Sequence, residues 1–356
     1  MGGAEKRFFD IFRALNDRDP NIHLVLPSCL LNIFQKENSI GSLSKNIVSI
    51  NMPVWAPIKF SFLLFLDVIS KSGKDDIFHY PLNPMFHLHI ISGRQFTMSL
   101  CDCYEIPKLS LKSKAKSIQL MASFFAKKID ILSPDIFGKS RANYRHFKNK
   151  ATLTPGGTYI YRHECLETER IRRFAFISRL EPNKGVDSFF EIVELISNKL
   201  LMLVGEPVRF DIYGEGSLDQ FVIDEVKRLK NRGISIEFHG YTDVNKILSS
   251  TWVVFSLQSV TNYPSRVVAE SLLRGCEVII LDTGDSRKFG NGAGINYLSS
   301  NYANLEEMIG GIFRRSSCYD LSQIKKIVDC AKLNYCSVKY IDYFSTLLRL
   351  ENQDET

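Results

Sequence analysis

The second half of the chain alternates short apolar runs with amphipathic stretches in a regular rhythm. The apolar runs are rich in β-branched and aromatic residues, and they lie at 174–178, 210–213, 234–239, 253–258 and 277–281. Stretches with helical periodicity separate them, near 185–199, 217–232, 243–250 and 265–275. Such an alternation is typical of a parallel sheet covered by helices. We therefore predict a complete Rossmann-like unit whose last helix follows Pro264, with Ser265 as its N-cap.

The first half shows a fainter version of the same rhythm. We expect strands at 22–27, 47–50, 77–80, 96–100, 130–133 and 151–154, and helices near 4–17, 58–71 and 112–128. Residues 320–350 are typical of two helices with no following strand. The predicted fold class is α/β with two doubly wound Rossmann-like domains. Their expected bounds are 1–155 and 174–318, with a linker at 156–173 and C-terminal helices at 319–356 that cross back to the N-terminal domain.

The composition fits a globular protein with a full core, because 45% of the 356 residues are apolar and 24% are charged. A net charge of +6 favours anionic partners such as phosphates, nucleotides, nucleic acid or acidic lipid headgroups without choosing among them. The eight cysteines form no CxxC pair, so we expect reduced thiols and a cytoplasmic location. No secretory signal is recognisable, and the longest apolar stretch, 60–70, is too short to span a bilayer. Any membrane contact should therefore be peripheral.

Two cations lie in a loop that leaves a predicted strand and opens a predicted helix. They are Arg179 and Lys184, within the segment 178–185. A helix N-terminus offers unsatisfied N–H donors and the positive end of the helix dipole, and a guanidinium fits phosphate oxygens. The segment therefore predicts an anion site. The alternative is a solvated turn with two surface cations.

A second loop between a predicted strand and a predicted helix contains Gly214 and Gly216. Glycines at such a place let the backbone turn sharply or approach a ligand closely. Tight turns between strands and helices use glycine routinely, so the pair is weak on its own.

The third loop, 262–265, enters the helix that carries Glu270. This residue lies within the first two turns, at the edge where open α/β sheets bind ligands. A carboxylate there accepts two hydroxyl hydrogen bonds, which is what a ribose offers. The alternative is an ordinary glutamate stabilised by the helix dipole.

The order and spacing of these three segments resemble the family 4 glycosyltransferases over residues 174 to about 285. The family pattern runs Gly-Arg-Leu, Lys-Gly, a GxG turn, and then Glu-x7-Glu before a small-residue helix and a glycine. The resemblance implies the GT-B fold, with two Rossmann-like domains facing across a cleft, and a retaining hexosyltransferase that needs no metal or cofactor. Its donor would be a nucleotide-diphosphate sugar of the UDP or GDP type. The implied donor-site residues are Arg179 and Lys184 on the diphosphate, Glu270 on the ribose, and Gly214, Gly216, Asn262, Tyr263, Pro264 and Ser265 around them.

The sequence departs from the family pattern at three places. Asn262 stands where the first glutamate of the pair contacts the transferred sugar, so the identity of that sugar is open. Cys101 replaces a histidine near the reacting sugar, which leaves Asp102 as a catalytic candidate that orients hydroxyl groups. Gly2 and Gly3 begin a segment that in the family follows the first strand and faces the donor, but no first strand precedes them here. Either the start is truncated, or the start codon is wrongly placed, or the N-terminal domain lacks that strand.

His79 is the histidine of a segment, 76–81, that resembles the family's Asp-x-x-His strand. We weigh a role in the site against that of a histidine packed on a buried strand.

The sequence indicates less about the acceptor than about the donor. The helical stretch that contains Leu120, Met121, Phe124 and Phe125 is flanked by Lys108, Lys112, Lys114, Lys116, Lys127 and Lys128. It either rests on an anionic membrane, which would bring the site to a lipid-linked glycan, or is a core helix with a solvated lysine face. By family analogy we expect a glycan or lipid-linked acceptor in the synthesis of a bacterial surface polysaccharide such as O-antigen, capsule or lipopolysaccharide, at the inner face of the cytoplasmic membrane.

Two rival hypotheses remain at this stage. One is a nucleotide-sugar-binding protein with weakened or lost catalysis, and the other is a different GT-B enzyme such as a sugar-nucleotide epimerase. Nucleic acid is not expected as a partner, because the basic residues are not interleaved with aromatic residues in a recognisable module.

Overall fold

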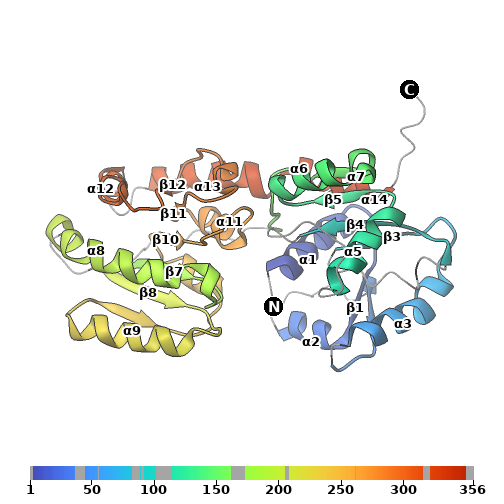
Figure 1. Ribbon diagram of the computed structural model, residues 1–356, viewed down its shortest axis with the longest axis horizontal. Coiled ribbons are helices and arrows are strands. Elements are labelled where there is room, and N and C mark those ends of the chain that lie inside the picture. The colour runs from blue at the N-terminus through green and yellow to red at the C-terminus, as the bar shows by residue number, and fades with distance from the viewer. Residues whose placement is uncertain are drawn as a thin grey trace. The chain divides into compact units, whose positions relative to one another are not determined.

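The computed structural model describes residues 3–36, 45–54, 56–81, 89, 92–101, 114–161, 173–204, 208–260, 262–315 and 321–349 (Figure 1). It divides into two compact units. Unit 1 comprises Met1–Tyr161 and Ser337–Thr356, and unit 2 comprises Arg162–Cys336. The first stretch of unit 1 thus ends at a later residue, and unit 2 begins at an earlier one, than the sequence suggests. Only the last helix, not the last two, belongs to unit 1. Each unit is an α/β fold, as the sequence predicts.

Unit 2 contains a six-stranded sheet in which every pair of neighbouring strands is parallel. Its strand order is β12-β11-β10-β7-β8-β9. The strands are β7 (Arg173–Ile177), β8 (Arg209–Tyr213), β9 (Ile236–Phe238), β10 (Val253–Ser256), β11 (Glu277–Leu281) and β12 (Ile295–Leu298). The chain runs outward from β7 to β9, returns to β10, and then runs outward the other way. The direction therefore reverses between β7 and β10, which is the topological switch point of the sheet.

Helices alternate with the strands of unit 2. They are α8 (Val186–Val204), α9 (Asp219–Asn231), α10 (Val244–Leu248), α11 (Arg266–Leu273), α12 (Leu305–Arg315) and α13 (Leu321–Tyr335), with 3-10 turns η3 (Pro182–Lys184) and η4 (Ser286–Phe289). The core on one face of the sheet is built from large rings such as Phe174, Phe189 and Phe255, and smaller side chains such as Ala175 and Val254 pack on the other face. Burial on both faces explains why these strands appear in the sequence as continuous apolar runs.

The sequence analysis did not predict strand β12. Its four residues, Ile-Asn-Tyr-Leu, lie at an edge of the sheet, and Asn296 interrupts the apolar run. The side chain of Asn296 donates a hydrogen bond of 2.8 Å to Glu277 Oε2 on the neighbouring strand. A short edge strand with a polar side chain bonded across the sheet has no clear signature in a hydrophobicity pattern.

In the described residues of unit 1 every strand pair is again parallel, but the strands form two separate sheets, β1-β2 and β3-β4-β5-β6. The strands are β1 (Leu24–Pro27), β2 (Ile47–Ile50), β3 (Ile77–Tyr80), β4 (Gln95–Leu100), β5 (Ile129–Ile131) and β6 (Ala151–Leu153). The helices are α1 (Gly3–Asn16), α2 (Ser28–Lys36), α3 (Pro57–Asp67) with the turn η2 (Ile69–Lys71), α5 (Lys114–Phe125), α6 (Pro134–Asn143), α7 (Arg145–Lys150) and α14 (Val338–Arg349). Of these, α2, α6 and α7 were not predicted.

The two sheets of unit 1 are separated at the position that one strand occupies in unit 2. In unit 2, β7 joins the pair β8-β9 to the three strands β10-β11-β12. Among the described residues of unit 1, no strand joins the pair β1-β2 to β3 in the same way. Strand β3 is accordingly half-buried at three of its four residues, whereas its counterpart β10 is fully buried. The separation lies where the sequence shows no first strand.

Buried polar side chains tie α14 to the rest of unit 1. Arg7 Nε on α1 donates to the Tyr340 hydroxyl at 2.8 Å, and Arg7 Nη2 lies 3.7 Å from Asp130 Oδ2 on β5. Asp130 also accepts hydrogen bonds from Ser99, Thr154 and Tyr343. Because both Arg7 and Asp130 are buried, these contacts compensate the cost of removing the charges from water.

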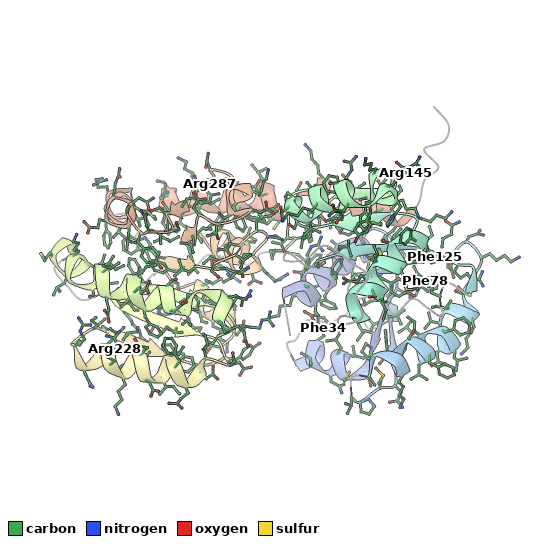
Figure 2. All side chains as sticks on the ribbon, viewed as in Figure 1. Phe34, Phe78, Phe125, Arg145, Arg228 and Arg287 are labelled. Carbon is green, nitrogen blue, oxygen red and sulfur yellow. The ribbon has the colours of Figure 1, made fainter. Side chains whose placement is uncertain are left out.

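Two histidines of unit 1 are held in the neutral form by their surroundings. His79 on β3 hydrogen-bonds to Thr97 and Ser99 and packs near Phe8 and Phe344, which favours packing on the strand over a role in a site. His89 contacts the rings of Phe78, a residue seen in Figure 2, and of Tyr80. Burial lowers the pKa of His79 and that of His89 to about 4.

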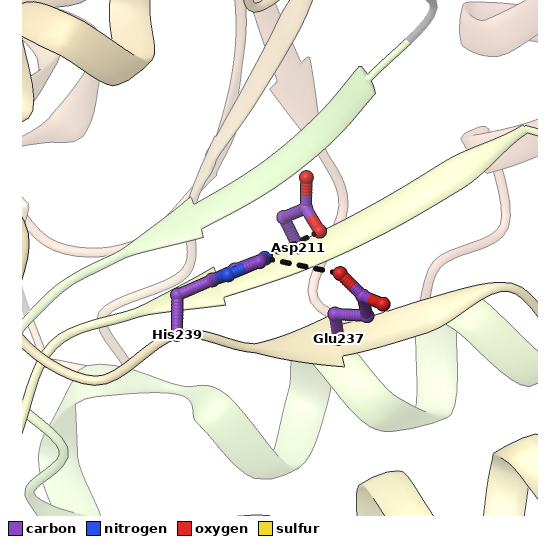
Figure 3. Close-up of side chains that lie close together, drawn as sticks. All are labelled: Asp211, Glu237 and His239. Atoms are coloured by element: carbon purple, nitrogen blue, oxygen red, sulfur yellow. Dashed lines mark hydrogen bonds and ion pairs between the residues drawn. The ribbon is translucent and has the colours of Figure 1, made fainter.

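An ionic network surrounds the buried carboxylate of Asp211 in unit 2, and Figure 3 shows Asp211 with two of its neighbours, Glu237 and His239. Asp211 Oδ1 lies 2.8 Å from His239 Nε2 and 2.9 Å from Arg209 Nε. Arg173 Nε lies 2.6 Å from the other oxygen of Asp211, whose side chain is fully buried. Glu237 is bound to Arg209 but is 47% exposed. The network therefore links β7, β8 and β9 through one central carboxylate.

We expect Asp211→Asn to lower the free energy of unfolding by about 3 kcal/mol, because the substitution leaves Arg173 without its buried counter-charge. Glu237→Gln is the matched control, and it should cost no more than about 1 kcal/mol since that carboxylate is half exposed. Urea unfolding of the full chain at pH 7 measures both values. Equal losses in the two variants would contradict a central role for Asp211.

We also expect unit 1 to lose stability as the pH falls from 6.5 to 4. The unfolded histidines have a pKa near 6.5 and take up protons in this window, whereas folded His79 and His89 do not. The free energy of unfolding should fall by up to about 1.4 kcal/mol per pH unit for each histidine. Unfolding midpoints between pH 4.5 and 7.5 should depend less on pH in His79→Gln and His89→Gln than in the exposed control His23→Gln. An unchanged slope in the double variant would refute this account.

Candidate functional site

Three loops at the carboxyl ends of β7, β8 and β10 contact one another in unit 2. They comprise residues 178–185, 214–218 and 257–265, and two of them flank the switch point between β7 and β10. Leu180 N donates to Glu215 O at 3.1 Å, and Leu218 N donates to Leu180 O at 3.0 Å. Ser259 N donates to Asn183 O at 3.4 Å. All three loops that the sequence singled out therefore belong to one edge of one sheet.

Glycine is required where the first two loops meet. Gly214 has a φ of +137°, and a Cβ atom on it would lie 1.8 Å from the carbonyl oxygen of Ser178. A Cβ on Gly216 would lie 2.4 Å from the carbonyl oxygen of Leu180. No side chain fits at either position, because the two backbones are in direct contact. This favours the interpretation of these glycines as tight-turn residues, and a contact with the donor stays a prediction.

Arg179 and Lys184 lie on the loop between β7 and α8. The side chain of Arg179 is exposed and forms no hydrogen bond or ion pair with the part of the chain that the structure describes. Lys184 is half-buried in η3, and its Nζ donates a hydrogen bond of 2.6 Å to Gln258 Oε1 on the loop after β10. Both cations are thus near the first turn of α8, where backbone N–H groups are unsatisfied within the helix. Gln258, which lies 74 residues from Lys184, was not predicted from the sequence.

Glu181, close to Arg179 in the sequence, contacts the loop after β8. Its carboxylate accepts hydrogen bonds from the hydroxyl and the N–H group of Ser217. These hydrogen bonds, more than the nearby charge of Arg179, hold the pKa of Glu181 below its usual value. The glutamate therefore stays ionised and bound to Ser217.

The loop after β10 is closed by Asn262. Its Nδ2 donates to Ser256 O at 2.6 Å, and its Oδ1 accepts from Ser256 Oγ at 2.9 Å, so the buried amide fastens the loop to the end of β10. Tyr263 is buried against Phe289, and the peptide bond between Tyr263 and Pro264 is cis. A contact between Asn262 and a sugar stays a prediction.

Ser265 occupies the predicted N-cap position of α11, but the predicted cap is wrong in one respect. Its hydroxyl accepts no hydrogen bond from a backbone N–H of the helix. The position is therefore set by the extended backbone of Ser265, with φ of −118° and ψ of 123°, and not by its side chain.

Glu270 lies in the second turn of α11, 21% exposed, and is paired with a cation that the sequence analysis did not consider. Arg266 Nε lies 2.7 Å from Glu270 Oε1. Residues four apart on a helix are neighbours, so this pair could have been predicted from the sequence. The ion pair fixes one carboxylate oxygen and the orientation of the side chain.

Three candidates of the sequence analysis belong to unit 1. Gly2 and Asp102 lie outside the described residues, and Gly3 is the first residue of α1. Cys101, just after β4, has its Sγ 3.6 Å from Arg7 Nη1 and 3.6 Å from the carbonyl oxygen of Pro81. Arg7, a residue that the sequence analysis did not single out, thus lies beside the position of the missing histidine.

The side chains in Figure 3 are the one group of His, Cys, Asp and Glu residues in the described ranges whose ligand atoms lie within 4.8 Å of one another. They do not fit a metal ion. Both oxygens of Asp211 are occupied by guanidinium and imidazole nitrogens, and two arginines already balance the negative charge. The arrangement is a structural ion network.

The sequence matches no model of a known protein family. No curated protein matches it in sequence either.

Several solved structures share its fold. HepE from Anabaena, in complex with UDP and glucose, matches with a TM-score of 0.68 at 14% identity, over 98% of this chain and 96% of that chain. A glycosyltransferase from Rickettsia africae matches with a TM-score of 0.66 at 15% identity, over 99% of this chain and 97% of that chain. A mutant of TarM from S. aureus, in complex with fondaparinux, α-GlcNAc-glycerol and UDP, matches with a TM-score of 0.60 at 15% identity over 81% of this chain. This chain spans only 58% of the length of that TarM chain. The chain therefore has the fold of the GT-B glycosyltransferases.

We expect Gly214→Ala to destabilise the protein much more than Gly240→Ala. Both glycines have positive φ angles, but a Cβ on Gly240 meets nothing within 4 Å, whereas one on Gly214 would overlap Ser178. Gly240→Ala should therefore cost only the backbone strain of about 1–2 kcal/mol. Thermal and urea unfolding compare the two variants, and similar losses would contradict the close contact between the first two loops.

Proposed function

We propose that this protein is a glycosyltransferase that moves a hexose from a nucleotide-diphosphate sugar, of the UDP or GDP type, to a glycan or lipid-linked acceptor. The observation that carries the proposal is the position of Arg179 and Lys184 at the switch point, on the loop that leads into α8. The fold shared with glycosyltransferases whose structures contain UDP supports it.

Two cations and a helix N-terminus are suited to a diphosphate. When the glycosidic bond breaks, negative charge develops on the leaving phosphate, and donors fixed in advance stabilise that charge. Lys184 is held in place by Gln258, and the exposed Arg179 can turn toward a ligand without breaking an ion pair in the described chain. We assign both residues to the donor diphosphate.

Glu270 is assigned to the ribose. Its pairing with Arg266 orients the carboxylate, and a carboxylate group has lone pairs for several donors. Asn262, Tyr263, Pro264 and Ser265 form the loop between β10 and α11, and we assign this loop to the sugar and the adjacent phosphate.

We further propose, by analogy with family 4 enzymes, that the transfer retains anomeric configuration and requires no metal. The acceptor hydroxyl would attack from the side of the leaving phosphate, whose oxygen takes the proton. Asp102 is proposed to orient the hydroxyl groups. We propose a role in bacterial surface polysaccharide synthesis at the inner face of the cytoplasmic membrane, on the same analogy.

One observation favours a second candidate, a nucleotide-sugar-binding protein without catalysis. Asn262 uses its amide to close its own loop, and it replaces the glutamate that contacts the sugar in the family. Nucleotide-sugar binding without product formation would support this candidate.

We expect Arg179→Ala to weaken the binding of the cognate nucleotide diphosphate by about 10- to 100-fold, because a hydrogen bond to a charged group contributes roughly 1.5–3 kcal/mol. Glu270→Ala should weaken the nucleoside diphosphate similarly but leave pyrophosphate binding unchanged, since it contacts only the ribose. Calorimetry against UDP, GDP, dTDP, CMP and pyrophosphate measures these effects. Arg232→Ala, at the far end of α9, is the control. Undiminished binding in both site variants, or no binding of any nucleotide by the unmodified protein, would refute the donor site.

A further inference from the structure

Helices α5 and α7 of unit 1 are packed together and present one continuous surface, which we call the α5–α7 surface. The ring of Phe124 stacks on that of His146 with centroids 3.9 Å apart. Ser123 Oγ lies 2.7 Å from His146 Nε2, and Lys150 Nζ donates to the carbonyl oxygen of Phe124 at 2.6 Å. Residues from α7 therefore lie directly beside the end of α5.

The centre of this surface is apolar. Met121, Phe124 and Phe125 are each at least 50% exposed. Leu120, Ala122 and Ser123 of the same helix are buried, so α5 has a face in the core and a second, apolar face toward solvent. Figure 2 shows Phe125 and Arg145 in this part of unit 1. The helix is thus not simply a core helix with a solvated lysine face.

The charged residues of α5, of the segment that follows it and of α7 are all basic. Residues 114–128 and helix α7 contain seven Lys and Arg residues and no Asp or Glu: Lys114, Lys116, Lys127, Lys128, Arg145, Lys148 and Lys150. The last five form no ion pair with an acidic residue in the described ranges of the chain. Burial and the nearby charge of Lys127 lower the pKa of Lys150. Lys127 and Lys150 are therefore close enough to repel each other, and the cations have no counter-charge within residues 114–128 or on α7.

We infer that the α5–α7 surface docks on an anionic lipid bilayer. Met121, Phe124 and Phe125 would enter the boundary between headgroups and acyl chains, and the surrounding cations would contact lipid phosphates. The inference deepens the proposed function. It rests on that function for the purpose of docking, which is to bring the enzyme to a lipid-linked acceptor. The surface itself belongs to unit 1 and shares no residue with the donor site of unit 2.

Two other occupants fit the surface less well. A second copy of the chain would bring two basic surfaces together without an acidic partner. A nucleic acid would use aromatic faces to stack its bases, but the ring of Phe124 is already stacked on His146. A bilayer, in contrast, matches both the exposed apolar side chains and the basic residues beside them.

The test is co-sedimentation of the full chain with vesicles of phosphatidylcholine alone or with 30% phosphatidylglycerol. We expect binding to the anionic vesicles at least tenfold tighter than to the neutral ones, and weaker as the salt concentration rises. Met121→Ala combined with Phe125→Ala should weaken it at least tenfold at every salt concentration. Lys127→Glu combined with Lys148→Glu should weaken it at least tenfold at low salt and reduce the salt dependence.

Matched controls on unit 2 keep the result specific. Met202→Ala combined with Leu333→Ala removes exposed apolar side chains, and Lys227→Glu combined with Lys230→Glu reverses exposed charges. Both should bind vesicles like the unmodified protein. Unfolding midpoints and nucleotide binding verify that every variant is folded.

The inference is overturned if the chain does not bind anionic vesicles, binds both vesicle types equally, or loses no affinity in the α5–α7 variants. Preference for a single-stranded RNA oligonucleotide over the vesicles would also overturn it. A chain that binds vesicles but no nucleotide would refute the proposed function and leave the docking surface intact, so the two failures are distinguishable.

Discussion

The direct contact between the backbones of two loops at the carboxyl edge of unit 2 governs the candidate site. Gly214 and Gly216 leave no room for a side chain against residues 178 and 180, and Gly185 lies equally close to the backbone of Leu257 on the third loop. Three loops from three strands are thereby held at fixed positions. The same contacts place Arg179 and Lys184 at the switch point, where the strand order leaves space for a ligand in open α/β sheets.

Most of unit 2 could be predicted from the sequence, because buried parallel strands are continuous apolar runs and their loops carry distinctive residues. Arg179, Lys184, Gly214 and Glu270 were found in this way. Gln258 could not be predicted, since its hydrogen bond to Lys184 depends on the tertiary structure. Strand β12 was missed because its polar residue, Asn296, bonds to a neighbouring strand.

Unit 1 was harder to predict for a physical reason. Its strands are short and several are only half-buried, so the apolar runs are weak. The start of α6 was missed although it could have been predicted, because Ser133 followed by Pro134 is an ordinary N-cap signal; in the structure the Ser133 side chain accepts a hydrogen bond from Ile136 N. The association of α14 with α1 could not be predicted, because it depends on the buried contact between Arg7 and Tyr340, which are 333 residues apart.

The central claim is that the loops after β7 and β10 bind a nucleotide diphosphate. A crystal structure of the full chain soaked with the nucleotide diphosphate it binds most tightly tests this claim most directly. We predict diphosphate oxygens within hydrogen-bond distance of Arg179 and Lys184, and ribose hydroxyls on Glu270. A nucleotide bound elsewhere, or one whose phosphates lie away from both cations, would contradict the account.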